Sequence, residues 1–168
     1  MTPAPEQYQG LRIVEQRGQR TQLIAPHNGG ELTFLYPAYG PNTYANVGLG
    51  IEQDQLKRPT MAETASLVHA AFNLDDRYSR EIKDFMTKGW LWAYTLSEYK
   101  PRPVNGVFIY DENDFIRFGD LPASELEKML GQRQEHGVVY SDDGLLRFVP
   151  FGYKVGEVSC SLELAKNP

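Results

Sequence analysis

Cysteine is scarce in this sequence, and long apolar runs are missing. Cys160 is the only cysteine, so no disulfide can form within the chain. The densest apolar run, residues 90–96, is far shorter than the roughly 18 residues that a membrane span needs. Residues 1–10 contain neither the basic nor the apolar region of a secretory signal, and they do not resemble a transit peptide. We therefore expect a cytoplasmic protein that does not contact a membrane.

An excess of basic residues is also missing. The chain has 17 Lys and Arg against 22 Asp and Glu, a formal charge of -5, which disfavours nucleic acid as a partner. Its 168 residues, 41% of them hydrophobic, exclude disordered and coiled-coil classes for the whole chain. We expect a flexible segment over residues 1–10 and a single domain over 11–168. The apolar end, residues 158–168, predicts a strand or helix, and a domain cut short at its C-terminus would look the same.

Short strands dominate the predicted elements. Strands flank a glycine turn within residues 11–25, and residues 31–36 form a third strand. Aspartate and glycine at 143 and 144 indicate a hairpin near the end of the chain. Further strands are predicted over residues 90–96, 106–110, 115–118, 138–140 and 145–149.

Three helices are predicted among these strands. Thr60 and Glu63 form the capping box of the first helix, in which Met61, Ala65, Val68 and Phe72 give an apolar stripe. The second helix runs over residues 79–88 and ends at Gly89, and the third begins near Pro122 and ends at Gly131.

Residues 36–50 are rich in Gly, Pro and Asn, which predicts a long loop. Strands and helices do not alternate regularly along the chain, which argues against a doubly wound parallel sheet. The predicted fold class is α+β, with a mainly antiparallel sheet of short strands and hairpins packed with about three helices.

No motif identifies a reaction. The glycines do not form a phosphate-binding loop, and the Gly-x-Ser-x-Gly sequence of serine hydrolases is absent. The three histidines, His27, His69 and His136, are too far apart for a compact metal site. We expect no metal and no cofactor, and no segment resembles a known family.

Two residues are catalytic candidates. His27 precedes Asn28 and two glycines in a turn where backbone amides could approach a ligand, so Asn28 is a candidate binding residue. Asp111 could assist as a carboxylate. A turn that requires positive φ is the alternative explanation for the His27 segment, and the residues favour it.

Tyrosine is the strongest compositional signal. Tyr36, Tyr39 and Tyr44 lie in the predicted loop, and Tyr99 lies beside Lys100 and Arg102. Loop tyrosines offer rigid contact area to a partner, and the alternative is that they cap the core.

The leading hypothesis is a small binding domain that acts through protein–protein or homo-oligomeric contacts, with Tyr36, Tyr39 and Tyr44 in the contact surface. One alternative is a hydrolase-like enzyme with a dispersed site near His27. The other is weak binding of single-stranded nucleic acid through Arg12, Arg17 and Arg20 and residues 100–102. The sequence does not decide whether the protein is an enzyme.

Overall fold

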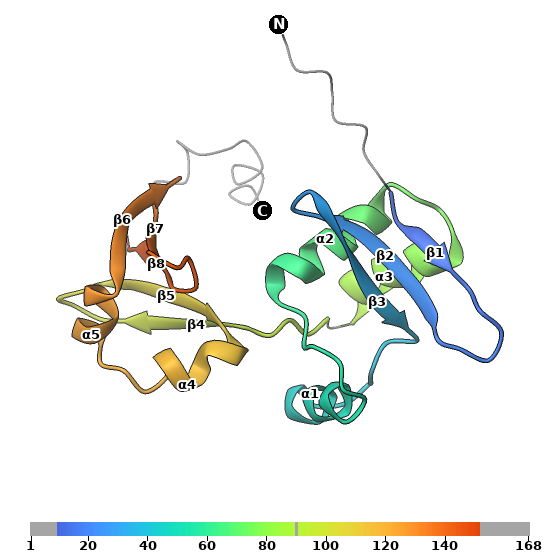
Figure 1. The fold of residues 1–168 in the computed structure, drawn as a ribbon, viewed down its shortest axis with the longest axis horizontal. Helices are drawn as coiled ribbons and strands as arrows, with labels where there is room; N and C mark the ends of the chain where they lie inside the picture. The colour runs from blue at the N-terminus through green and yellow to red at the C-terminus, as the bar shows by residue number, and fades with distance from the viewer. Residues whose placement is uncertain (1–9, 90, 152–168) are drawn as a thin grey trace, which may run out of the picture. The chain divides into compact units, whose positions relative to one another are not determined.

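The computed structural model describes residues 10–89 and 91–151, and the predicted element at residues 158–168 lies outside them. The chain divides into two compact units, unit 1 (Met1–Tyr94) and unit 2 (Thr95–Pro168). Each unit has its own antiparallel sheet and its own helices (Figure 1). Each also has its own cluster of buried hydrophobic residues. The predicted α+β class is therefore confirmed.

Unit 1 begins with a three-stranded sheet in the order β1-β2-β3. Its strands are β1 (Arg12–Val14), β2 (Thr21–His27) and β3 (Gly30–Tyr36), as the sequence predicts. The β2–β3 turn consists of Asn28 at φ 47° and Gly29 at φ 79°. Positive φ at both central residues is the geometry that Asn-Gly favours in a two-residue hairpin, so the turn explanation for this segment is confirmed.

The predicted loop over residues 36–50 is wrong in its second half. Helix α1 (Tyr44–Gln53) begins there, with the side chain of Thr43 accepting a hydrogen bond at its N-terminus. Val47 and Ile51, one turn apart, are both buried and hold the helix against the rest of unit 1.

The glycines of α1 pack closely against neighbouring side chains rather than forming turns. A Cβ atom at Gly48 would lie 2.8 Å from Cζ of Arg58, and one at Gly50 would lie 3.3 Å from the ring of Tyr39. Tertiary packing therefore outweighs the poor helix propensity of glycine.

Helices α2 (Met61–Phe72) and α3 (Arg77–Lys88) follow, as predicted. The capping box is present, because Thr60 Oγ1 accepts from the Glu63 backbone N–H at 3.2 Å and the Glu63 carboxylate accepts from the Thr60 N–H at 2.8 Å. Gly89 is the C-terminal cap of α3, which is also confirmed.

The buried face of α2 differs from the predicted stripe. Met61 and Phe72 are 58% and 55% exposed, whereas Leu67 and Ala71 are buried. The helix is apolar on more than one side, so the residues that face inward are decided by where β2 and α3 contact it.

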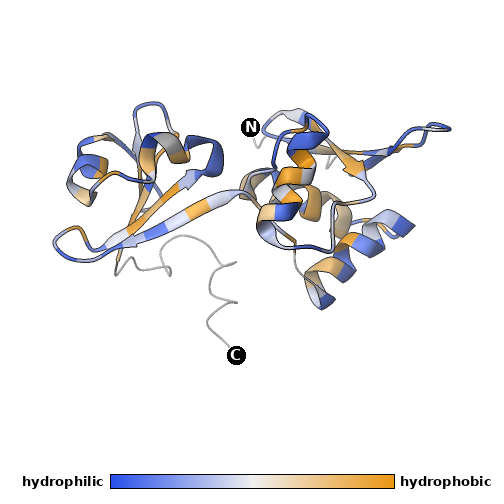
Figure 2. Ribbon diagram, turned by 90° about the horizontal axis from the view of Figure 1, so that it is seen from below, coloured by the Kyte–Doolittle hydropathy of each residue, from blue (hydrophilic) through white to orange (hydrophobic). Residues whose placement is uncertain are grey.

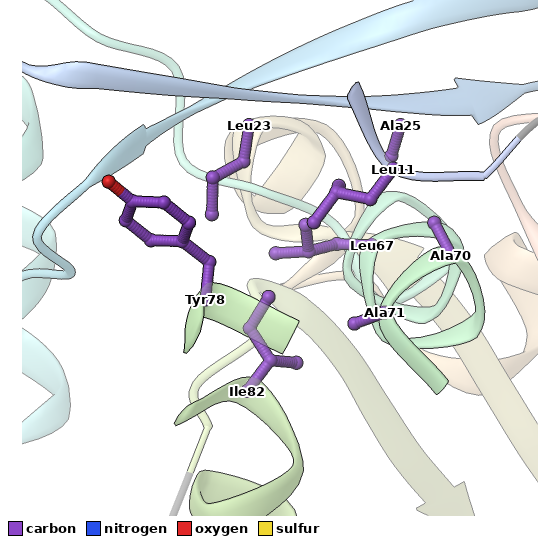
Figure 3. Packing of buried hydrophobic residues seen from close by; sticks show 8 residues of the cluster. All are labelled: Leu11, Leu23, Ala25, Leu67, Ala70, Ala71, Tyr78 and Ile82. Atoms are coloured by element: carbon purple, nitrogen blue, oxygen red, sulfur yellow. The ribbon is translucent and has the colours of Figure 1, made fainter. Parts of the chain in front are cut away.

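The core of unit 1 lies between the sheet and the helices α2 and α3. Figure 3 shows its side chains pointing into this space from both sides. The members are Leu11, Leu23, Ala25, Leu67, Ala70, Ala71, Tyr78 and Ile82.

Unit 2 contains a five-stranded antiparallel sheet in the order β4-β5-β8-β7-β6. Buried and half-buried residues alternate along the interior strand β5, and Figure 2 shows orange, hydrophobic stretches in the strands of this unit. The strands are β4 (Thr95–Lys100), β5 (Gly106–Asp111), β6 (Leu130–Glu135), β7 (Val138–Ser141) and β8 (Arg147–Pro150). Three short helices, η1 (Glu112–Asp114), α4 (Phe115–Phe118) and α5 (Ala123–Lys128), lie between β5 and β6.

Several predicted boundaries in unit 2 are wrong. Phe115–Phe118 is a helix rather than a strand, and the Gly119 N–H donates to the Phe115 carbonyl oxygen at 2.7 Å, as in a helical turn. The predicted strand at residues 90–96 begins only at Thr95. Helix α5 ends at Lys128, before Gly131, which belongs to the unpredicted strand β6. Short segments without caps give local sequence signals too weak to fix their type.

The β7–β8 hairpin, predicted from its Asp-Gly turn, is confirmed. Within it, the Asp143 carboxylate accepts hydrogen bonds from Ser141 Oγ (2.6 Å), the Leu145 N–H (3.1 Å) and Arg117 (2.6 Å). These donors, led by Ser141, lower the pKa of Asp143 to about 2.

Because the pKa of Asp143 is lower in the folded state, its stabilising effect is present above the unfolded value of about 3.9 and is lost as the pH falls through about 2. We expect the urea midpoint of wild type to drop more steeply between pH 4 and 2 than that of Asp143→Asn. The neighbouring Asp142→Asn should behave like wild type. Parallel pH profiles for wild type and Asp143→Asn would contradict this assignment.

Candidate functional site

His27, the predicted catalytic candidate, lies at the end of β2 and contacts α2. Its Nδ1 is 2.9 Å from Ser66 Oγ, and its Nε2 is 3.0 Å from Asn28 Nδ2. The structure therefore brings His27 and Asn28 together with a serine that the sequence analysis missed. No local signal could have found Ser66, since it lies 39 residues from His27.

The hydrogen-bond partners define the direction of this chain of contacts. Ser66 Oγ donates to the carbonyl oxygen of Ala62 at 3.2 Å, so its lone pairs face His27. His27 Nδ1–H then donates to Ser66, and Nε2 accepts from the Asn28 amide. A general base must instead accept the serine proton. In this arrangement the imidazole ties the β2–β3 turn to α2.

Asp111, the second catalytic candidate, ends β5 in unit 2. Its Oδ1 accepts from Thr95 Oγ1 at 2.7 Å and pairs with Arg147 Nη2 at 3.4 Å. His27 and Asp111 thus belong to different units, and each makes its hydrogen bonds within its own unit.

Tyr36, a predicted binding residue, contacts the helices of unit 1. Its hydroxyl donates to Glu81 Oε2 at 2.7 Å, and its ring meets Tyr78 edge-on at 4.9 Å. The hydrogen bond to Glu81, with burial, raises the pKa of Tyr36.

Tyr39 closes a small polar cluster at the surface. Its hydroxyl donates to Asp54 and accepts from Arg20, whose guanidinium lies 4.8 Å from the ring centre. Burial and the hydrogen bond to Asp54 raise the pKa of Tyr39. The side chain is half-buried and packs against the cluster of Val47, Ile51 and Tyr94.

Tyr44, at the start of α1, belongs to an aromatic cluster. Its ring centre lies 4.6 Å from that of Tyr94 and 5.5 Å from that of Trp92. All three predicted binding tyrosines therefore make internal contacts in unit 1, where they cover its core.

We expect the double variant Tyr39→Ala/Tyr44→Ala to lose about 3 kcal/mol of unfolding free energy, because both rings pack against the buried cluster of Val47, Ile51 and Tyr94. Urea denaturation followed by tryptophan fluorescence measures this loss. Tyr99→Ala, with a ring that is 54% exposed, is the control and should change stability by less than about 1 kcal/mol. Unchanged stability with weakened self-association would instead show that Tyr39 and Tyr44 form a contact surface.

Two of the arginines considered for nucleic-acid binding have acidic partners. Arg12 pairs with Glu31 at 2.7 Å, and Arg20 pairs with Asp54 at 3.0 Å. Their charges are therefore already balanced within unit 1.

In the part of the chain that the structure describes, no three His, Cys, Asp or Glu side chains gather closely enough to hold a metal ion. Over the same residues, no helix has the length and hydropathy to cross a membrane.

The two faces of the five-stranded sheet in unit 2 differ sharply. On one face, Phe118 of α4 and Leu126 of α5 pack against Phe108, Tyr110 and Phe148. Side chains alternate between faces along a strand, so the intervening residues of β5 and β8 point to the opposite side. We call this opposite side the open face.

The open face carries a continuous line of apolar side chains. Tyr99 of β4 is paired with Val107 of β5, and Val107 is paired with Val149 of β8. Phe151, two residues after Val149, brings its ring to 6.4 Å from that of Tyr99. We call Tyr99, Val107, Val149 and Phe151 the apolar row; its two rings are 54% and 73% exposed.

Charged groups on the rest of the open face are paired with one another. Arg147 lies between Ile109 and Tyr140 in the register and contacts Asp111. Arg133 lies 4.6 Å from the ring centre of Tyr140 and is paired with Glu135 at 2.9 Å. The open face is thus apolar at one end and charge-balanced at the other.

Comparisons with protein-family models, with curated proteins and with solved structures find no match for this chain.

Proposed function

We propose that this chain is a protein-interaction domain that acts through protein–protein or homo-oligomeric contacts of its open face. The observation that carries the proposal is the apolar row, in which two neighbouring aromatic rings, each more than half exposed, lie beside two valines on one face of the sheet. Water contact with such a row is unfavourable, and aromatic side chains are enriched where proteins bind one another.

The charge distribution supports a protein partner. Residues 95–151 contain ten acidic and six basic residues, a net charge of -4. Asp111 and Glu135, on the open face, are each paired with an arginine. A face with balanced charges at one end and exposed rings at the other suits protein surfaces better than phosphate groups.

The proposal can be tested by placing the photoreactive residue p-benzoylphenylalanine at position 99 and, as a control, at Ser124 of α5. We expect irradiation to give defined adducts from position 99, either with a second copy or with a protein that mass spectrometry identifies. Phe151→Ser should reduce these adducts, because it removes half of the exposed ring pair. Equal adducts from positions 99 and 124 would overturn the proposal.

A hydrolase-like activity is the second candidate, and the contact of Ser66 with His27 at 2.9 Å is the observation that favours it. The reaction would require Ser66 to rotate its proton away from Ala62 towards His27. A fluorophosphonate probe tests this directly. Covalent labelling of Ser66 that His27→Ala abolishes would support hydrolysis, and the absence of labelling would remove this candidate.

A further inference from the structure

Strand β4 forms an edge of the five-stranded sheet. Among the described residues, residues 96–100 of this strand pair with β5 alone, so the backbone groups along their other side are available to another strand. We propose that β4 of a second copy of this chain occupies this edge, antiparallel and centred on Tyr99. The inference rests on the proposed interaction function and specifies its partner.

The charges on β4 are complementary to themselves. The strand carries Glu98 and Lys100 on either side of Tyr99. In an antiparallel pair centred on Tyr99, each Glu98 faces Lys100 of the other copy, and opposite charges across strands stabilise the pairing. Within one copy, Glu98 Oε1 accepts from Lys100 Nζ at 2.5 Å, while the buried Oε2 has no hydrogen-bond partner in the described residues. A second lysine would supply one.

Other registers lose this complementarity. Centring the pair on Glu98 places two carboxylates opposite each other, and centring it on Ser97 places Glu98 opposite Leu96. A register in which Tyr99 of one copy faces Glu98 of the other would turn the apolar row of one copy to the opposite side of the joined sheet. Only centring on Tyr99 both pairs opposite charges and keeps the two open faces on one side.

Centring on Tyr99 also joins the two apolar rows. Since Tyr99, Val107 and Val149 are neighbours across β4, β5 and β8, the pair of tyrosines at the centre would make the row continuous over six strands. Aromatic pairs opposite each other on neighbouring strands add to this stabilisation.

The pairing would stop at two copies. Pro101 follows Lys100 and has no N–H to donate, so it ends the paired segment. The other edge of the sheet, β6, shifts register between Leu130 and Gln134, and such an irregularity discourages further strand addition. A two-fold pair that uses both β4 edges is therefore closed.

Sedimentation velocity of the full chain over a range of concentrations tests the proposal by charge reversal. Wild type should form a dimer, whereas Glu98→Lys and Lys100→Glu should each raise the dimer Kd roughly tenfold or more. The double variant Glu98→Lys/Lys100→Glu should regain the wild-type Kd. Mixing the two single variants should give heterodimers, because each then faces opposite charges.

The matched control reverses the analogous pair on β6, Arg133→Glu/Glu135→Arg, which should leave the dimer unchanged. Far-UV circular dichroism and the urea midpoint establish that every variant is folded.

The outcomes separate this inference from the proposed function. A dimer that is insensitive to charge reversal, or a monomer at about 1 mM with adducts to another protein from position 99, overturns the β4 pairing and leaves the interaction function standing. A monomer without adducts at position 99 overturns both.

Discussion

Gly106→Ala is expected to destabilise unit 2 by about 3 kcal/mol, because the added methyl group has no room. Its Cβ would lie 2.3 Å from the ring of Phe148 and 2.7 Å from the carbonyl oxygen of Val149. The Phe148 ring is 4.7 Å from that of Phe108 in the core, and the Val149 backbone is fixed by β5–β8 pairing. Neither neighbour can move away cheaply.

Gly119→Ala is the matched control for this prediction. A Cβ there would also lie 2.3 Å from a phenylalanine ring, that of Phe115. Phe115 is 45% exposed and can rotate into solvent, so we expect a loss below about 1 kcal/mol. Urea unfolding followed by far-UV circular dichroism compares the two. Equal losses would contradict the argument that backbone and core contacts decide the effect.

The strands with a clear turn signal are the elements that the sequence predicts best. Asn28 and Gly29, and later Asp143 and Gly144, place hairpin turns where the structure has them. Backbone geometry at these positions depends on the residue itself, so it can be predicted without knowing the rest of the fold. The capping box at Thr60 and Glu63 is local in the same way.

The elements that the sequence analysis misassigned depend on distant contacts. Helix α1 contains two glycines that predict a loop in the sequence, whereas in the structure Arg58 and Tyr39 pack against them. The four-residue helix at Phe115–Phe118 is too short to show periodicity. In both cases the neighbours that decide the structure lie outside the segment.

The candidate site required the pairing of strands, which local patterns do not contain. The sequence shows Tyr99 as a tyrosine beside basic residues. That Val107 and Val149 are its neighbours follows only from the register of β4, β5 and β8. Similarly, the contact between His27 and Ser66 follows from α2 packing on β2. A one-residue change in register would move each of these side chains to the other face.

Tyr94→Ala should be the most destabilising change in unit 1, with an expected loss of about 4 kcal/mol. The side chain is 1% exposed and packs with Val47 and Ile51 of α1. Its hydroxyl donates to the Tyr44 carbonyl at 3.2 Å, and Arg58 lies 5.2 Å from its ring centre. Removing the ring leaves a cavity beside α1 that these neighbours cannot fill.

Tyr94→Phe separates the ring from the hydroxyl. It keeps the packing on α1 and loses one hydrogen bond, so we expect a loss of only about 1 kcal/mol. Urea unfolding gives both values, and hydrogen exchange of the α1 amides should rise far more in Tyr94→Ala. If exchange in α1 stays at the wild-type level, α1 is held by its other contacts. Similar losses for both variants would mean that the hydroxyl, rather than the ring, anchors the helix.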